Sequence, residues 1–174
     1  MRSTILTIAL VLPAAAFADS AAGIKWTPPS AWKQDAPRSM RVATYSIPPA
    51  KGDSEAAECA VFYFGPGQGG SVDANLQRWV AQFETPDGKP VPSPAPKKSK
   101  INGLAVTRLE LEGTYLASMG PMAPPGAAKK PGYRLLGAIV EAPEGPVFFK
   151  LTGPAKTVAV AKADFEKMLS SLNR

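Results

Sequence analysis

Residues 133–172 read YRLLGAIVEAPEGPVFFKLTGPAKTVAVAKADFEKMLSSL, and this stretch decides the fold. The apolar runs at 133–140 and 147–152 flank the turn-forming tetrapeptide APEG, so they predict a β-hairpin. From residue 157 the apolar spacing changes to that of an amphipathic helix. Its apolar side comprises Val158, Ala161, Phe165, Met168, Leu169 and Leu172. A hairpin followed by a one-sided helix predicts an antiparallel sheet with a helix on one face.

The preceding part of the chain extends this sheet and adds a second helix. Further strands are predicted at 24–26, 41–47, 58–64 and 104–115. The run ECAVFYF at 58–64 is apolar on both faces and predicts a central strand. Ser71 or Asp73 can cap a helix whose apolar stripe is Leu76, Trp79, Val80 and Phe83. Asn102-Gly103 predicts a type I′ turn into the strand at 104–115. The fold class is therefore α+β, a mostly antiparallel sheet covered by two amphipathic helices.

Two segments rich in proline or glycine interrupt the predicted strands. Residues 85–99 contain five prolines, and residues 117–132 read ASMGPMAPPGAAKKPG. Both are expected to be irregular surface excursions. Because strands flank each excursion closely, we expect one domain over residues 19–174.

The first 18 residues have the pattern of a secretory signal peptide. Arg2 supplies the basic start, an apolar run comes next, and Ala16-Phe17-Ala18 forms a small-x-small cleavage site. The apolar run is too short to span a bilayer. We expect cleavage after Ala18 and a periplasmic or secreted protein, without a membrane span.

Composition removes several classes of site. The chain has no histidine, which excludes histidine-based triads and histidine-ligated zinc. Cys59 is the single cysteine, so no internal disulfide and no cysteine-based metal cluster can form. The net charge of +6 fits an anionic partner or none, and no basic–aromatic pattern points to nucleic acid. We expect no cofactor and no metal site.

Several runs resemble a known fold family. They are PSAW at 29–32, FFKLTGP at 148–154 and FEKMLSSL at 165–172. In this order they resemble the PsbP-like fold family. The runs FYFGPGQGGSVDANLQRW at 62–79 and GYRLLGAIVE at 132–141 resemble a group of secreted bacterial proteins with no established activity. The resemblance implies a non-catalytic accessory role, since binding and assembly factors dominate the fold family.

A glycine-rich loop is the first candidate site. Gly65, Gly67 and Gly70 fit the spacing G-x-G-x-x-G between a strand and a helix, where backbone N–H groups can bind an anion. The candidate residues of the loop are Gly65, Gly67, Gln68, Gly69, Gly70 and Ser71. The helix leads into prolines rather than a parallel strand, so a dinucleotide site is not expected. A plain turn is the simpler hypothesis; a peptide, carboxylate or phosphate ligand is the other.

Four smaller features complete the candidates. Arg78 is expected either to pair with a strand carboxylate such as Glu110 or to bind an anion. Met119 and Met122 could bind Cu(I) or contact a partner, or simply lie in a loop. The lysines at 97–100 and 129–130 would form one basic patch if the two excursions were adjacent. Trp26 and Trp32 offer either an aromatic platform or an N-terminal segment packed on the sheet.

These features predict a non-catalytic binding or assembly protein of the bacterial envelope. Its expected partner is an envelope protein or a small anionic ligand. Two alternatives stay open: a Cu(I) or small-anion binding protein, and a hydrolase-type enzyme using carboxylate, lysine or tyrosine chemistry.

Overall fold

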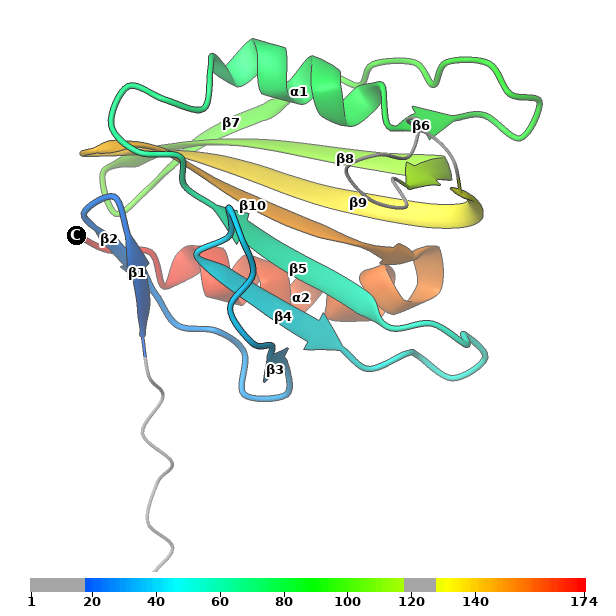
Figure 1. Cartoon of the computed structure of the whole chain (residues 1–174), viewed down its shortest axis with the longest axis horizontal. Helices are drawn as coiled ribbons and strands as arrows, with labels where there is room; N and C mark the ends of the chain where they lie inside the picture. Colours follow the sequence, from blue (N-terminus) through cyan, green and yellow to red (C-terminus); the bar gives the residue numbers. More distant parts are fainter. Residues whose placement is uncertain (1–17, 118–127) are drawn as a thin grey trace, which may run out of the picture.

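A computed structural model describes residues 18–117 and 128–174. The predicted signal peptide, apart from Ala18, lies outside the described residues, as do Met119 and Met122. The short strands β1 (Asp19–Ala21) and β2 (Ile24–Trp26) form a separate hairpin. Every other strand belongs to one eight-stranded sheet (Figure 1).

The sheet is antiparallel at every described pairing. Its strands are β3 (Lys33–Gln34), β4 (Ala43–Ile47), β5 (Ala57–Phe62), β6 (Phe83–Glu84), β7 (Lys97–Ile101), β8 (Leu104–Ala117), β9 (Ala128–Ala142) and β10 (Gly145–Pro154). The order is β3-β4-β5-β10-β9-β8-β6, and β7 pairs with β8. The β9–β10 hairpin is the one predicted from residues 133–152, and β5 is an interior strand beside it. Asn102 and Gly103 both have positive φ between β7 and β8, as a type I′ turn requires.

The longer helix, α2 (Ala155–Ser170), packs on one face of the sheet. All six apolar residues predicted for its buried side are buried there. They meet the inward side chains of β9 and β10, with Phe149 and Leu151 fully buried. Trp26 closes this core: its indole donates to the Tyr45 hydroxyl at 2.8 Å and its ring meets Phe149 edge-on.

The shorter helix, α1 (Val72–Val80), covers only part of the opposite face. Leu76 and Trp79 pack over β8, β9 and the start of β10. The part of this face formed by β4, β5 and the second half of β10 is not under α1 (Figure 1). The prediction of a sheet covered by two helices is therefore only partly right: both helices are present, but the cover is incomplete on the α1 face.

Three predicted boundaries are wrong, each for a local reason. Strand β7 begins at Lys97, inside the first predicted excursion, because prolines end at residue 96 and β8 offers a free edge there. Strand β8 extends to Ala117 and β9 starts at Ala128, so the second excursion is shorter than predicted. Phe83 lies in β6 rather than in the helix, although it is buried in the same core as Trp79.

The start of α2 depends on a distant carboxylate, which gives a testable prediction. Pro154 at the N-cap has no side chain to cap the helix. Asp53, in the β4–β5 loop, instead accepts hydrogen bonds from the Thr157 backbone N–H at 2.9 Å and hydroxyl at 2.6 Å. Asp53→Ala should lower the free energy of unfolding by about 2 kcal/mol, because charge-assisted bonds and a cap are lost. Urea denaturation measures this; a change as small as that of Asp164→Ala, on the same helix, would contradict it.

Candidate functional site

The incompletely covered part of the α1 face forms a cavity of about 370 Å³, called here the open cavity. It arises from strand alternation: on β5, Glu58 and Phe62 point to this face, whereas Cys59 and Val61 point to the α2 core. On β10, Lys150 and Thr152 point into the cavity by the same rule. This interior part of the sheet therefore carries polar side chains and is not covered by a helix.

Lys150 is the central cation of the open cavity. Its Nζ donates to Gln82 Oε1 at 2.6 Å and to the Tyr115 hydroxyl at 3.2 Å, and it lies 5.1 Å from the centre of the Tyr115 ring. None of the ion pairs among the described residues involves Lys150. Burial, and secondarily the nearby charge of Arg41, lowers the pKa of this amine to about 8. Glu58 opposes the shift weakly, so Lys150 is a desolvated cation held by neutral acceptors.

Arg41 and Glu58 form the second charged group of the cavity. Arg41 Nη1 lies 2.8 Å from Glu58 Oε1, and its guanidinium lies over the Phe62 ring at 5.5 Å. Arg38 bonds the other oxygen of Glu58 from outside the cavity, also at 2.8 Å. Glu58 therefore has two guanidinium partners.

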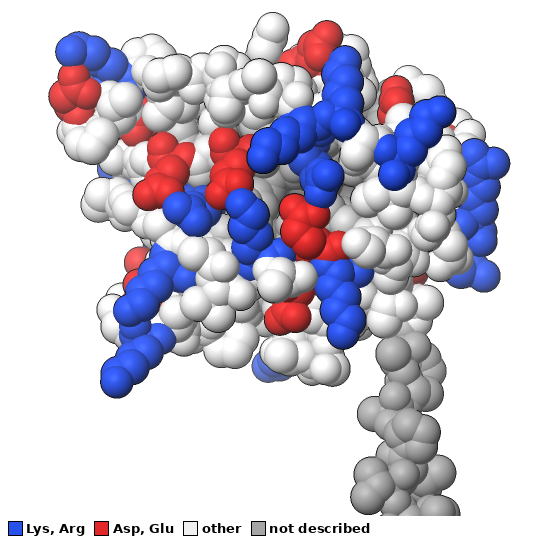
Figure 2. Space-filling model, turned by 180° about the vertical axis from the view of Figure 1, so that it is seen from behind, with Lys and Arg blue, Asp and Glu red and all other residues white. Residues whose placement is uncertain are grey.

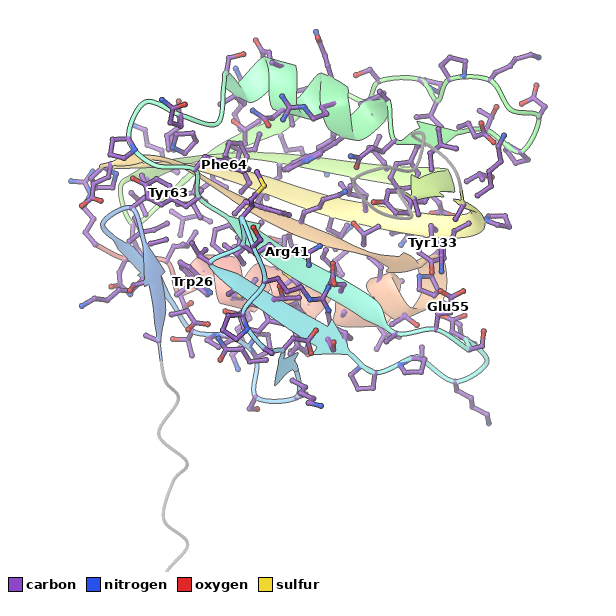
Figure 3. All side chains as sticks on the ribbon, in the orientation of Figure 1. Trp26, Arg41, Glu55, Tyr63, Phe64 and Tyr133 are labelled. Atoms are coloured by element: carbon purple, nitrogen blue, oxygen red, sulfur yellow. The ribbon has the colours of Figure 1, made fainter. Side chains whose placement is uncertain are left out.

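A third group closes the far end of the cavity. Glu55 pairs with Lys130 and accepts a hydrogen bond of 2.8 Å from the Tyr133 hydroxyl. Its bond to Lys130, and secondarily that to Tyr133, hold the pKa of Glu55 below its usual value. The ring of Tyr133 stacks on Tyr115 with centroids 6.0 Å apart. Figure 3 shows Glu55 and Tyr133 together at one end of the sheet, Phe64 at the other, and Arg41 between them.

Thr152 adds an unpartnered polar group to the cavity wall. Its hydroxyl oxygen is buried and has no hydrogen-bond partner among the described residues. Buried hydroxyls without partners are uncommon in folded proteins and call for an explanation. Thr152 is two residues from Lys150 on the same face of β10, so the two Cβ atoms are about 7 Å apart.

The glycine-rich loop does not line this cavity. Gly65, Gly67, Gly69 and Gly70 all have positive φ, which explains why glycine occupies these positions. A Cβ on Gly69 would also lie only 3.0 Å from the Phe148 ring.

The side chains at the start of α1 are engaged within the loop. The buried Asn75 amide donates to the Gly69 and Ser71 carbonyls, and Ser71 Oγ accepts from the Ala74 N–H. Gln68 is exposed at the turn. The acidic Asp73 in the first helical turn also opposes an anion at this helix start.

The other sequence candidates separate from one another. Arg78 bonds Asn75 Oδ1 at 3.0 Å and not Glu110, which lies on the α2 face and pairs with Lys162. Figure 2, seen from behind, shows acidic and basic side chains interspersed on the molecule's far side. Trp26 and Trp32 are buried in the core, so they offer no aromatic platform.

The two lysine clusters do not form one patch. Lys97 is opposite Arg108 on β8, whereas Lys129 is opposite Leu116, eight residues further along that strand. At the rise of a β-strand this is about 27 Å. Lys129 also pairs with Glu84 at 2.6 Å. The clusters are therefore separate, and each is part of a strand rather than of a loop.

Sequence reasoning missed the open cavity, although one signal was present. Lys150 interrupts the apolar run VFFKLTG of an interior strand, where both neighbours in sequence are fully buried. A charged residue in such a run is expected to serve a purpose other than packing. Its partners, Gln82 and Tyr115, come from segments whose proximity the sequence pattern does not reveal.

Two further observations concern the described residues as a whole. No three acidic or thiol groups among residues 18–117 and 128–174 gather closely enough to hold a metal ion. In the same ranges, neither helix has the length and apolar character needed to cross a bilayer.

Comparison with known proteins identifies the fold. No family model and no curated protein sequence matches this chain. Solved structures do match, and one of them places the architecture in the class of PsbP-like folds. The solution structure of cyanobacterial PsbP (CyanoP) from Synechocystis sp. PCC 6803 aligns with a TM-score of 0.54. The alignment covers 90% of this chain and 89% of that one at 11% sequence identity, which establishes similarity of fold alone.

Proposed function

We propose that this protein is a non-catalytic binding protein that acts outside the cytoplasm, with the open cavity as its binding site. The observation that supports this most strongly is Lys150, a desolvated cation whose close partners among the described residues are neutral. A buried charge without a counter-ion costs stability, and such costs are typical of functional sites. The cavity also lies on a sheet, and sites built on strands hold their binding side chains more precisely than sites built on loops.

The location rests on the predicted signal peptide and on the residues directly after it. Strand β1 begins at Asp19, next to the predicted cleavage point. The Asp19 carboxylate accepts a hydrogen bond from Tyr45 and so attaches the start of the mature chain to the core. The resemblance to secreted bacterial proteins supports the same compartment.

An enzyme with lysine chemistry is the second candidate, because an amine whose pKa falls to about 8 is a usual nucleophile or base. The surroundings of the amine favour binding instead. Gln82 cannot take up a proton, and burial raises the pKa of Tyr115, so its hydroxyl stays neutral. Neither neighbour can therefore act as a general base toward the amine at neutral pH.

A bulky residue at the cavity wall tests the proposal. Ala56 is exposed and lines the open cavity, whereas Ala163 is exposed on α2 at the opposite face. Immobilised protein should retain a protein or small molecule from bacterial envelope extract, and Ala56→Trp should retain about tenfold less, since bulk at the site costs more than about 1 kcal/mol. Ala163→Trp should retain as much as wild type.

Mass spectrometry identifies and quantifies what each immobilised variant holds. Equal retention by all three proteins would remove the open cavity from the proposal. Loss in both tryptophan variants would mean that the retained molecule binds elsewhere or non-specifically.

A further inference from the structure

The open cavity has a surplus of positive charge. Its wall contains the cations Arg41, Lys130 and Lys150 and the carboxylates Glu55 and Glu58. The two carboxylates are bonded to Arg41 and Lys130, so the surplus charge belongs to Lys150. A ligand with one negative charge would balance this single surplus positive charge, whereas a dianion would leave the cavity with a net negative charge.

Two hydrogen-bond donors in the cavity have no acceptor among the described residues. The Lys150 ammonium has three N–H donors and uses two of them, on Gln82 and Tyr115. The Thr152 hydroxyl is the second unused donor. Both side chains point to the same side of β10, so a carboxylate with two oxygens can accept from both.

The rest of the wall is apolar and aromatic. Phe62 forms one side, under the Arg41 guanidinium, and the stacked rings of Tyr115 and Tyr133 form the other. The volume of about 370 Å³ is in the range of small-molecule sites. A bare inorganic anion would leave these ring faces without contact.

We propose that the open cavity binds a small organic monocarboxylate with an apolar body, its carboxylate between Lys150 and Thr152 and its body against Phe62 and the stacked tyrosines. This inference rests on the proposed function and names the ligand class for the same site. The binding of a carboxylate would neutralise the charge of Lys150 and satisfy the hydroxyl of Thr152.

Titration of the purified full-length protein with benzoate, phenylacetate and hexanoate tests the inference. Nuclear magnetic resonance should detect saturable shifts of the Lys150 and Thr152 backbone amides at about millimolar concentrations or below. Benzamide, the neutral counterpart of benzoate, and inorganic phosphate should each bind at least about tenfold more weakly. The affinity for carboxylates should fall as the pH rises above about 8, because the free amine loses its proton there.

Matched variants separate charge from packing. Lys150→Met should weaken carboxylate binding by about tenfold or more, and Thr152→Val by about fivefold, since each removes one donor. Lys162→Met, on the opposite face, should bind like wild type.

Four results would overturn the inference. They are the absence of saturable shifts with every carboxylate, equal binding of benzamide, phosphate binding as tight as that of carboxylates, and unchanged affinity in Lys150→Met. If Ala56→Trp still loses a molecule captured from extract, the open cavity stays a binding site and only the ligand class is wrong. If carboxylates bind as expected but the extract gives nothing, the ligand class holds and the envelope partner is wrong.

Discussion

Lys150→Met should raise the free energy of unfolding at pH 7 by about 1–2 kcal/mol. The reason is that folding removes the Lys150 ammonium from water, and its partners among the described residues are neutral. Methionine has a similar length, fills the same space and has no charge to desolvate. Part of the gain is lost because Gln82 and Tyr115 lose a donor, which is why the expected gain is smaller than the full desolvation cost.

The pH dependence of this difference is the sharper test. The pKa of Lys150 is about 8 in the folded protein and 10.5 in the unfolded chain, so the unfolded chain binds more protons between these values. Wild-type stability must therefore rise relative to Lys150→Met as the pH increases from about 8 to 10.5, by up to about 3 kcal/mol. Below about pH 8 the difference should be constant.

Comparison with the variant removes the effects of groups that do not contact Lys150. Burial raises the pKa of Cys59 and of Tyr45, so both destabilise the fold at alkaline pH, but equally in the two proteins. Urea denaturation at several pH values between about 6 and 11 gives the difference directly. Lys162→Met, which removes a half-buried, ion-paired lysine, serves as the control. A difference between wild type and Lys150→Met that does not change with pH would mean that Lys150 is well solvated.

The stability result also bears on function. A sequence selected for packing alone would place an apolar residue at position 150, between Phe149 and Leu151, as in a strand that is buried on both faces. A lysine that lowers stability at neutral pH is instead explained by a ligand that neutralises it. If Lys150→Met is more stable but loses carboxylate binding, the two results together assign the residue to recognition.

Apolar periodicity was sufficient to predict most of the fold. The β9–β10 hairpin, α2 and its six buried residues, the Ser71 cap and the turn at Asn102-Gly103 all result from local pattern and turn chemistry. The strand starts at Lys97 and Ala128 could not be predicted in this way. Both lie in or beside proline-rich segments, and both strands form because they pair with β8. Pairing is a long-range property, which local propensity does not encode.

The candidate site was less predictable than the fold. The glycine-rich loop has the spacing of a known motif, and in the structure the Asn75 amide bonds the Gly69 carbonyl while Ser71 Oγ caps α1. The open cavity is assembled from four strands and from Gln82 after α1, and no two of its charged groups are neighbours in sequence. Only Lys150 is visible in the sequence, as a charge in an apolar strand. Which part of the α1 face remains uncovered depends on where the short helix α1 packs, which is a property of the tertiary structure.

Trp79→Ala should lower the free energy of unfolding by about 3–5 kcal/mol, the range for large aromatic side chains removed from a core. Trp79 is 6% exposed and belongs, with Leu76, to the core between α1 and the sheet. The sheet accommodates it by having glycine at position 137, since a Cβ there would lie 2.6 Å from Trp79 Cε3. Gly137→Ala should therefore also destabilise, by about 1–3 kcal/mol, through overpacking.

The double variant gives the more specific result. With Trp79 reduced to alanine, the methyl group introduced at position 137 no longer clashes and partly fills the vacated space. The loss in Trp79→Ala/Gly137→Ala should thus be smaller than the sum of the two single losses by at least about 1 kcal/mol. Strictly additive losses, measured by urea denaturation, would mean that Trp79 and Gly137 do not contact each other.

This contact also links the fold to the open cavity. The Gln82 N–H donates to the Trp79 carbonyl at 3.1 Å, and the Gln82 side chain accepts from Lys150. Loosening Trp79 should therefore move Gln82 and weaken benzoate binding as well as stability, whereas Asp53→Ala should lower stability alone. A Trp79→Ala protein that is less stable but binds benzoate like wild type would show that α1 does not position the Lys150 ammonium.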